Sequence, residues 1–460
     1  MPDKDELFYT RKSISDITDE KEQKLADEYS EEFKRFLDSS KTERESVAQA
    51  IKLAEECGFK PYKRETKINA NSKVYIDIGG KALILAVIGQ KPLDEGVNIA
   101  AAHIDAPRLD LKQAPLYEDG DMAFFRTHYY GGIKKYQWVT IPLALHGVVV
   151  KKDGTVVNVV IGEDENDPVF MITDLLPHLA KDQEKKTLAE AFTGENLNIL
   201  LGTKPAGDDK EKDRVKLAVM KILNEKYDII EEDFFSSELE AVPAMRARDV
   251  GLDRSMIGAY GNDDRSCAFA ALRAILDTNN PPKTAVCVLA DKEEVGSNGV
   301  SGMQSALFDA FMEDLCEAAG VKLRDCYKES FCLSADVCNA FDPNFAEVSE
   351  KQNAAKLGYG IGIEKFTGAR GKSGASDASA EVVAMLRKLF EDNNIVWQLI
   401  ELGKVDQGGG GTVALHMANR GIDTIDAGIP VLSMHAPYEI VSKLDCYMAY
   451  KGIRCVYGRE

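Results

Sequence analysis

From about residue 243 onward, short apolar segments alternate with amphipathic ones, and this alternation restricts the possible folds more than any other feature of the chain. Strands that alternate with helices build a largely parallel sheet, because each helix returns the chain to the start of the next strand. We therefore predict an α/β fold in which a mixed, mostly parallel sheet is sandwiched by helices. The predicted helices are 265–276, 304–319, 376–391 and 437–450, and the predicted strands are 284–290, 331–336, 395–402 and 428–433.

A central segment, from about 107 to 240, differs from the rest of the chain in its residue types and in its pattern of strands and helices. Residues suited to catalysis are scarce there, and strand-like runs at 138–151 and 156–161 precede a helix at 215–227. This change indicates an inserted, β-rich domain within a discontinuous catalytic domain. Before the insertion we expect helices within 14–57 and a hairpin of strands 74–78 and 83–88 around Gly79-Gly80. An apolar strand at 97–102 follows. The predicted division is a catalytic domain of residues 1–106 and 241–460, and an inserted domain of residues 107–240.

Charge and cysteine content exclude several classes of protein. The chain of 460 residues carries 76 acidic and 57 basic side chains, a net charge of −19, which disfavours binding to nucleic acid or to anionic membrane surfaces. No apolar run approaches the roughly 18–20 residues of a membrane helix, and the charged N-terminus does not resemble a secretory signal. The nine cysteines form no CxxC pair, so we expect reduced thiols and a cytoplasmic protein.

Histidine and acidic side chains recur at the ends of the apolar strands. Open α/β sheets bind their ligands beyond the carboxyl ends of the strands, so these side chains can converge in one crevice. Converging carboxylates repel one another unless cations lie between them, and we therefore predict a metal site. A single Asp after a strand is usually a turn residue or a helix cap, but chance does not readily supply the whole set. The set comprises His103, Asp105, Asp263, Asp264, Asp291, Glu293, Glu294, Asp336, His435 and Glu439.

The adjacent pair Glu293-Glu294 is the most informative part of this set. Neighbouring side chains point in different directions, so one carboxylate can bind metal while the other faces a water molecule. A divalent cation lowers the pKa of its water from about 15.7 toward 7, and a nearby carboxylate can then accept the proton. Asp263 could bridge two cations with its two oxygens, and Asp105 is suited to orienting a ligand such as His103. The alternative for Glu293 and Glu294 is that they are two solvated acids in a loop.

Other motifs are weaker. The chain has no HExxH, no GxSxG and no zinc-finger spacing of cysteines. The glycines at 408–411 lack the Lys-Ser/Thr of a phosphate-binding loop, and Gly410 and Gly411 are better suited to a backbone edge beside which a peptide can lie. A basic stretch with Lys365 either holds a substrate carboxylate or carbonyl, or is an ordinary polar loop.

Five segments, HIDAPRLD, DDRSCAF, DKEEVGS, SADVCNA and SMHAPYE, together resemble the aspartyl aminopeptidase and aminopeptidase I family of dinuclear zinc exopeptidases. The resemblance covers nearly the whole chain and indicates a bacterial-type member with the zinc exopeptidase fold. It implies Glu293 as general base, Asp105 as orienting acid, and Asp263 as the ligand that bridges two metal ions. The metal ligands that it implies are His103, Asp263, Glu294, Asp336 and His435.

The same resemblance implies an assembly and a mode of substrate binding. The inserted domain would mediate dimerisation, and dimers would build a tetrahedral dodecamer that encloses the active sites. His146 matches a histidine that reaches a neighbouring subunit's site, and Lys365 matches a lysine that contacts the substrate.

From these observations we predict a metalloaminopeptidase that hydrolyses the N-terminal residue from peptides with a free N-terminus by a two-metal, water-activated reaction. The expected cofactors are two divalent ions per subunit, Zn²⁺ above all, although Co²⁺ and Mn²⁺ suit the same ligands. Two alternatives are a related zinc carboxypeptidase or deacylase, and a non-catalytic scaffold that retains the fold. Acidic, neutral and hydrophobic first residues all remain open as substrates.

Overall fold

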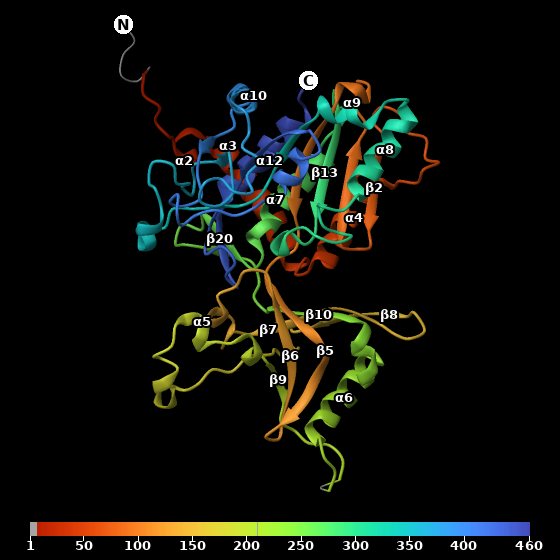
Figure 1. The fold of residues 1–460 in the computed structure, drawn as a ribbon, viewed down its shortest axis with the longest axis vertical. Helices are drawn as coiled ribbons and strands as arrows, with labels where there is room; N and C mark the ends of the chain where they lie inside the picture. The colour runs from red at the N-terminus through yellow and green to blue at the C-terminus, as the bar shows by residue number, and fades with distance from the viewer. Residues whose placement is uncertain (1–6, 209) are drawn as a thin grey trace. The chain divides into compact units, whose positions relative to one another are not determined.

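The structure is a computed structural model, and it describes residues 7–208 and 210–460 (Figure 1). Its residues fall into two compact units. The first unit comprises Met1–Asp105, Ala247–Met434 and Glu439–Glu460, and the second comprises Ala106–Arg246 with His435–Tyr438.

A nine-stranded sheet forms the centre of the first unit, in the order β1-β2-β3-β13-β4-β14-β18-β16-β17. Strands β13, β4, β14 and β18 are neighbours and run parallel, whereas β3 and β16 are antiparallel to β13 and β18. The prediction of a mixed, mostly parallel sheet is therefore confirmed. The strands are β1 (Lys60–Pro61), β2 (Lys73–Ile78), β3 (Ala82–Val87), β4 (Val97–His103), β13 (Thr284–Ala290), β14 (Phe331–Ser334), β16 (Ile361–Glu364), β17 (Trp397–Leu399) and β18 (Asp423–Gly428).

Helices cover both faces of this sheet, as the strand sequences require. All seven residues of β4 and of β13 are buried, because each face packs against apolar helix residues. Alternate strand residues therefore belong to two separate cores: Ala100 packs in one and Ile99 in the other. Helices α3 (Glu20–Asp38), α4 (Glu43–Glu56), α7 (Asn262–Leu276), α10 (Ala380–Asp392) and α12 (Lys443–Tyr457) contribute to the first core, and α8 (Leu307–Ala319), α9 (Leu323–Lys328) and α11 (Ala414–Ala418) to the second.

Helix ends follow local signals in the sequence. Asp19 caps α3, and Thr42 forms a capping box with Glu45 at the start of α4. A short helix, α2 (Ile14–Ile17), precedes α3. Figure 1 shows α2 and α3 in red, close to α12 at the C-terminal end of the chain. The predicted helical character of residues 14–57 is thus confirmed.

A second sheet of the first unit has five strands in the order β11-β12-β20-β19-β15, and it corrects two predictions. The strand predicted at 428–433 is present as the shorter β19, residues 430–432, but it belongs to this smaller sheet, whereas the central sheet uses β18, which ends at Gly428. The predicted helix 437–450 is wrong in its first part, because residues 439–442 pair with β12 and β19. These strands are β11 (Arg248–Val250), β12 (Met256–Ala259), β15 (Cys338–Asn339), β19 (Pro430–Leu432) and β20 (Glu439–Ser442).

The second unit is built on a six-stranded sheet in the order β8-β7-β10-β5-β6-β9, and all its neighbouring strands are antiparallel. Helix α6 (Arg214–Tyr227) and the short helix α5 (Leu188–Ala191) accompany the sheet. The strand predicted at 138–151 starts later, at Leu143, because residues 135–138 form a 3₁₀ turn and Pro142 precedes the strand. The strands are β5 (Arg108–Asp119), β6 (Met122–Tyr130), β7 (Leu143–Val150), β8 (Val156–Ile161), β9 (Ile199–Gly202) and β10 (Ser237–Pro243).

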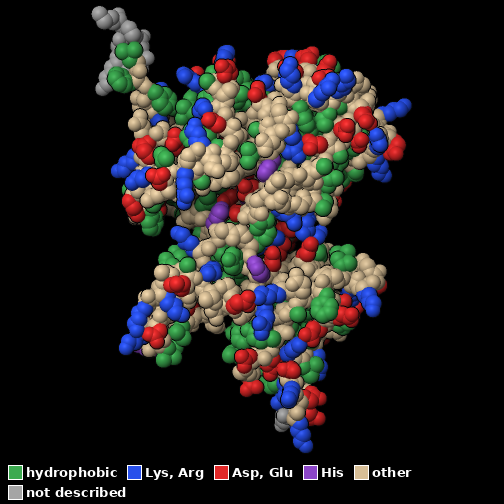
Figure 2. Space-filling view, in the orientation of Figure 1, with side chains coloured by type: hydrophobic (Ala, Val, Ile, Leu, Met, Phe, Trp, Pro, Cys, Tyr) green, Lys and Arg blue, Asp and Glu red, His purple; other side chains and the backbone are tan. Residues whose placement is uncertain are grey.

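Charged side chains of both signs are interspersed over the face of the molecule in Figure 2 rather than gathered into one basic patch. Among the described residues, no helix is long and apolar enough to span a lipid bilayer.

Candidate active site

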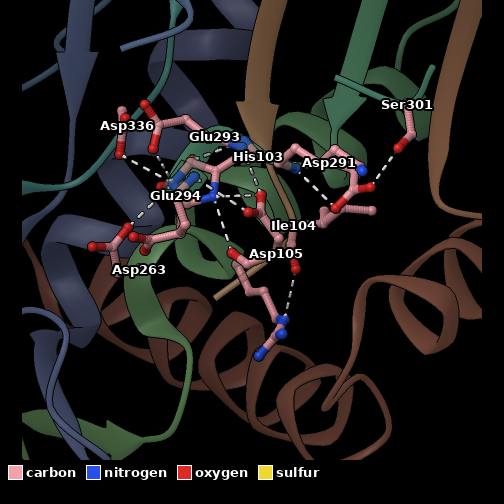
Figure 3. Close-up of polar contacts among 12 residues, drawn as sticks. His103, Ile104, Asp105, Asp263, Asp291, Glu293, Glu294, Ser301 and Asp336 are labelled. Atoms are coloured by element: carbon pink, nitrogen blue, oxygen red, sulfur yellow. Dashed lines mark hydrogen bonds and ion pairs between the residues drawn. The ribbon is translucent and has the colours of Figure 1, made fainter. Parts of the chain in front are cut away.

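Three neighbouring parallel strands end at the same edge of the central sheet and deliver the reactive side chains of the first unit. His103 is the last residue of β4, Glu293 and Glu294 follow β13, and Asp336 follows β14. The strands are in register, with Ala290 of β13 opposite His103 and Ser334 of β14 opposite Ala101. The side chains therefore start from the same level of the sheet (Figure 3).

The imidazole of His103 lies at the centre of this group. Its Nε2 atom is 3.2 Å from Oδ1 of Asp263, 3.7 Å from Oδ1 of Asp336 and 4.0 Å from Oε2 of Glu293. His103 and Asp263 are buried, and the side chain of Asp336 is only 13% exposed. One ligand atom from each of His103, Asp263 and Asp336 lies within 4.8 Å of the other two, a spacing that a single metal ion can span.

Asp105 organises this region from behind. Its two carboxylate oxygens accept hydrogen bonds from the backbone N–H groups of Glu293 (3.1 Å) and Glu294 (3.2 Å). Nδ1 of His103 is 3.0 Å from the carbonyl oxygen of Asp105 and 3.3 Å from its Oδ1. Because Asp105 engages Nδ1, Nε2 of His103 is directed at the carboxylates of Asp263 and Asp336. The buried carboxylate of Asp105 thus fixes both the imidazole ring and the loop that carries the two glutamates.

Asp263 belongs to the start of α7, where the backbone departs from helical geometry. Asp263 and Asp264 have φ/ψ values of −83°/110° and −112°/25°, and the peptide bond between them is cis. The N–H of Asp263 donates to Oε2 of Glu439 at 2.9 Å. Oδ2 of Asp264 accepts the backbone N–H of His103 at 3.3 Å. Successive residues therefore serve different partners, and the carboxylate of Asp263 faces the imidazole.

Burial sets the protonation of these groups in the absence of cations. It raises the pKa of Glu293 to about 8, against a smaller opposing effect of His103. Burial also raises the pKa values of Asp264 and Asp336. For His103, burial alone would lower the pKa, but hydrogen bonds with Asp105, Asp263 and Asp336 outweigh it and raise the pKa well above its usual value. A cation beside these carboxyls would stabilise their ionised form and so oppose the effect of burial.

The donor set fits a divalent metal ion. An imidazole nitrogen and carboxylate oxygens suit zinc, cobalt or manganese, and the orientation of His103 by a carboxylate is typical of metal-binding histidines. Mutual repulsion between the carboxylates is relieved when a cation lies between them. The first unit therefore contains residues that can hold a metal ion at the carboxyl edge of its sheet.

The remaining predicted residues lie elsewhere. His146 is buried in β7 of the second unit, with Nε2 3.1 Å from Oε1 of Glu163. His435 is in the segment 435–438, which is compact with the second unit, and its Nδ1 is 2.8 Å from the carbonyl oxygen of Gly132. The roles predicted for both histidines stay predictions.

Two further predictions concern the loops of the first unit. Lys365 is 42% exposed and pairs with Asp377 at 2.6 Å. Gly410 and Gly411 border open space, because a Cβ atom on either would meet nothing within 4 Å among the described residues. Their roles in substrate binding also stay predictions.

The sequence pattern missed the supporting roles of Asp264, Arg265 and Glu439. The sequence presents Glu439 only as an acid after a strand, yet its carboxylate accepts the backbone N–H of Asp263. Arg265 is 1% exposed and donates to the carbonyl oxygen of Ile104 at 3.1 Å. The available signal was an arginine at the fourth position of α7, directly before a mostly apolar run, because a buried arginine needs several acceptors.

An α/β sheet whose carboxyl edge gathers an imidazole and several carboxylates, with Glu293 beside the imidazole, is typical of metal-dependent hydrolases. The model of the family "Aminopeptidase I zinc metalloprotease (M18)" matches residues 36–457. The chain belongs to this M18 family, and its resemblance to aminopeptidase I is confirmed.

Individual relatives agree with the family match. The chain is 52% identical over 456 residues to a probable M18 family aminopeptidase 1 of Clostridium acetobutylicum, covering 97% of this chain and 98% of the relative. Identity to a protein of the same description from Thermotoga maritima is 47% over 431 residues, covering 93% and 94%.

Solved structures agree as well. The M18 aminopeptidase of Thermotoga maritima superposes with a TM-score of 0.94 at 44% identity, covering 98% of this chain and 100% of that chain. Aminopeptidase I of Clostridium acetobutylicum gives a TM-score of 0.92 at 48% identity, with the same coverage. The chain is a zinc metalloaminopeptidase, a hydrolase of peptide bonds, so that prediction is confirmed, and neither the carboxypeptidase or deacylase alternative nor the scaffold alternative has support.

Proposed function

We propose that this aminopeptidase uses two zinc ions per subunit, held by His103, Asp263, Glu294, Asp336 and His435, with Asp263 between the two ions. The observation that carries the proposal is the convergence of the His103 imidazole with the carboxylates of Asp263 and Asp336, at 3.2 and 3.7 Å. The proposal extends the zinc chemistry of the family to particular residues and to a number of ions.

Glu293 is proposed as the general base. Its side chain is 17% exposed and lies beside His103, and it is not needed to hold the loop, because Asp105 does so through the backbone N–H groups of Glu293 and Glu294. Bound divalent cations would polarise the scissile carbonyl and acidify the attacking water. Glu293 would accept a proton from that water and deliver it to the leaving amine, so one carboxylate serves both steps.

A surplus of buried acids supports selection of the free N-terminus. The α-ammonium group of a peptide carries a positive charge, which the carboxylates of Asp263, Glu293 and Asp336 would attract, whereas an N-acetylated peptide lacks that charge. We propose that Lys365, Gly410, Gly411 and His146 contact the remainder of the substrate. Support is greatest for the two glycines, which border open space, and least for His146, which is buried against Glu163.

We further propose a homo-oligomer in the cytoplasm, in which the inserted domain of residues 107–240 mediates dimerisation. A structure of a yeast aminopeptidase 1 is described as a dodecamer, and it shares the fold with a TM-score of 0.76 at 22% identity. A tetrahedral dodecamer is the corresponding assembly for this chain. All nine cysteines are free thiols, in agreement with a reducing compartment.

The test compares an aminoacyl anilide with its N-acetylated form on zinc-loaded protein, with and without chelator. We expect cleavage of the aminoacyl anilide with a free amine but not of its N-acetylated form, and we expect this activity to be lost with chelator. Equal cleavage of both substrates would contradict selection of the N-terminus. Metal analysis should give two zinc ions per subunit, and one ion would refute the dinuclear site. A peptide library on the same sample would identify the preferred first residue, and the particle mass would decide the assembly.

A further inference from the structure

The segment His103–Ile104–Asp105 is held by backbone contacts that the metal chemistry does not explain. The N–H of His103 donates to Oδ2 of Asp264 at 3.3 Å, and the N–H of Ile104 donates to the carbonyl oxygen of Ala290 at 2.9 Å. The carbonyl oxygen of Ile104 accepts from Nε of Arg265 at 3.1 Å. The carbonyl oxygen of Asp105 lies against Nδ1 of His103. Each of these buried backbone groups has a specific partner.

Arg265 has an unusual position for a guanidinium group. It is 1% exposed, and besides Ile104 it donates from Nη2 to the carbonyl oxygen of Lys41 at 2.9 Å. Its guanidinium carbon lies 5.3 Å from the centre of the Tyr260 ring. The guanidinium group thus connects the segment between α3 and α4 to the residue that separates His103 from Asp105. A buried arginine persists only where several acceptors compensate for its loss of water.

We propose that Arg265 is a positioning residue for the metal centre: by holding the carbonyl of Ile104, it fixes His103 on one side and Asp105 on the other. Residues 263–265 then act as one unit, since Asp263 faces the imidazole, Asp264 holds the N–H of His103, and Arg265 holds the next carbonyl. A displaced Ile104 carbonyl would move Asp105, and with it the N–H groups of Glu293 and Glu294. The inference rests on the proposed function, because it requires His103 to be a metal ligand.

Arg265→Lys tests the inference, since an ammonium group retains the charge but not the planar fork that serves two carbonyls. Supporting residues of this kind change metal affinity or activity by roughly 10–100-fold. We expect zinc affinity, measured by competition with a chromogenic chelator, to fall within that range. We also expect kcat to fall with little change in KM, because the substrate does not touch Arg265. Zinc affinity within twofold of the unaltered protein would overturn the inference.

Arg420→Lys is the matched control. Arg420 is also largely buried, and its guanidinium donates to the carbonyl oxygens of His416, Met303 and Ser305, none of them a candidate site residue. It should lower thermal stability while zinc affinity stays unchanged. An equal loss of zinc in both variants would assign Arg265 a general structural role and refute the inference.

Two further variants separate the possible failures. Arg265→Gln, which can donate one N–H to Ile104, replaces the lysine variant if that protein does not fold. If neither variant folds while Arg420→Lys does, Arg265 is a folding residue and the inference is wrong. His103→Ala tests the underlying site: normal zinc content in this variant would refute the proposed ligand set. Loss of zinc in His103→Ala with full affinity in Arg265→Lys would refute the inference alone.

Discussion

Replacing Glu293 by Gln should separate the catalytic role of this carboxyl from its effect on stability. Gln has nearly the same shape but cannot accept a proton at neutral pH. A general base contributes about 10²–10⁴-fold to rate, so kcat of the zinc-loaded variant should fall by that factor. Zinc content should stay normal, because the neighbouring Glu294 is the proposed ligand.

In the metal-free protein, Glu293→Gln should increase the free energy of unfolding, although it lowers the activity of the zinc-loaded protein. Burial raises the pKa of Glu293 from its ordinary 4.5 to about 8, so the folded state retains a proton that the unfolded chain releases as pH rises through this window. Stability is therefore lost between these two pH values. With about 1.4 kcal/mol per tenfold change, the penalty is about 1 kcal/mol at pH 5 and about 3 kcal/mol at pH 7. Gln removes this penalty, and the metal-free variant should become the more stable protein.

Thermal unfolding in chelator at pH 5, 6 and 7 measures this difference. For a chain of 460 residues, about 3 kcal/mol corresponds to about 3 °C in the unfolding midpoint. The gap between Glu293→Gln and the unaltered protein should widen as pH rises and should shrink when zinc is added, because a nearby cation lowers the pKa of the carboxyl. A gap that is the same at all three pH values would refute the reasoning, and near-normal turnover would exclude Glu293 as the base.

Asp445→Asn is the matched control for this experiment. Burial also raises the pKa of Asp445, to about 7, but its carboxylate accepts the N–H groups of Gly358 and Gly360 at 2.7 Å each. Its folded pKa is raised, so its contribution to stability is also lost as pH rises from 3.8 to about 7. The Asn variant should show a flatter pH dependence with unchanged kcat. A loss of turnover comparable to that of Glu293→Gln would show that the activity assay reports stability only.

Three other outcomes are expected. Removal of zinc by a chelator should abolish aminopeptidase activity, and added zinc should restore it and raise the unfolding midpoint; activity that survives complete removal would contradict the metal mechanism. His103→Ala should lose zinc, as measured by metal analysis, while circular dichroism stays native. Asp105→Asn should weaken zinc binding or activity by roughly 10–100-fold, because an amide nitrogen would face one of the two N–H groups of residues 293 and 294; unchanged values for both would exclude the orienting role.

The central sheet could be predicted because its strands are buried on both faces. A strand such as β13, with all seven residues buried, reads as a continuous apolar run that ends abruptly at Asp291. The carboxyl ends of parallel strands meet at one edge, so the sequence alone groups His103, Glu293 and Asp336. The signal lies in the step from an apolar run to a charged residue.

Other elements depend on pairing that a single sequence does not display. Strand β18 has the sequence DTIDAG, and its acids and glycine disfavour a strand, yet it pairs with both β14 and β16. Residues 439–442 follow Pro437, which favours the start of a helix, but pairing with β12 and β19 outweighs this preference. Tertiary pairing thus overrides local propensity at both places.

Contacts between side chains and backbone were the least predictable part of the site. Whether Arg265 pairs with an acid or holds a carbonyl depends on where a loop some 160 residues earlier in the chain passes, and that is fixed only when α7 packs beside β4. Residue type indicated that a buried arginine needs acceptors, but it did not identify Ile104 and Lys41.

The position of the site within the fold explains how mutually repelling groups are held close together. The carboxyls of Asp105, Asp263 and Asp336 are attached to β4, α7 and β14, elements whose apolar residues form a continuous core. These elements cannot separate to relieve the repulsion without exposing that core, at roughly 25 cal/mol for each Å² of apolar surface. Burial, and after it the neighbouring carboxylates, therefore raises the pKa of Glu293, and the group retains its proton. A cation that enters displaces such protons, so zinc affinity must increase with pH over the range in which the buried carboxyls titrate.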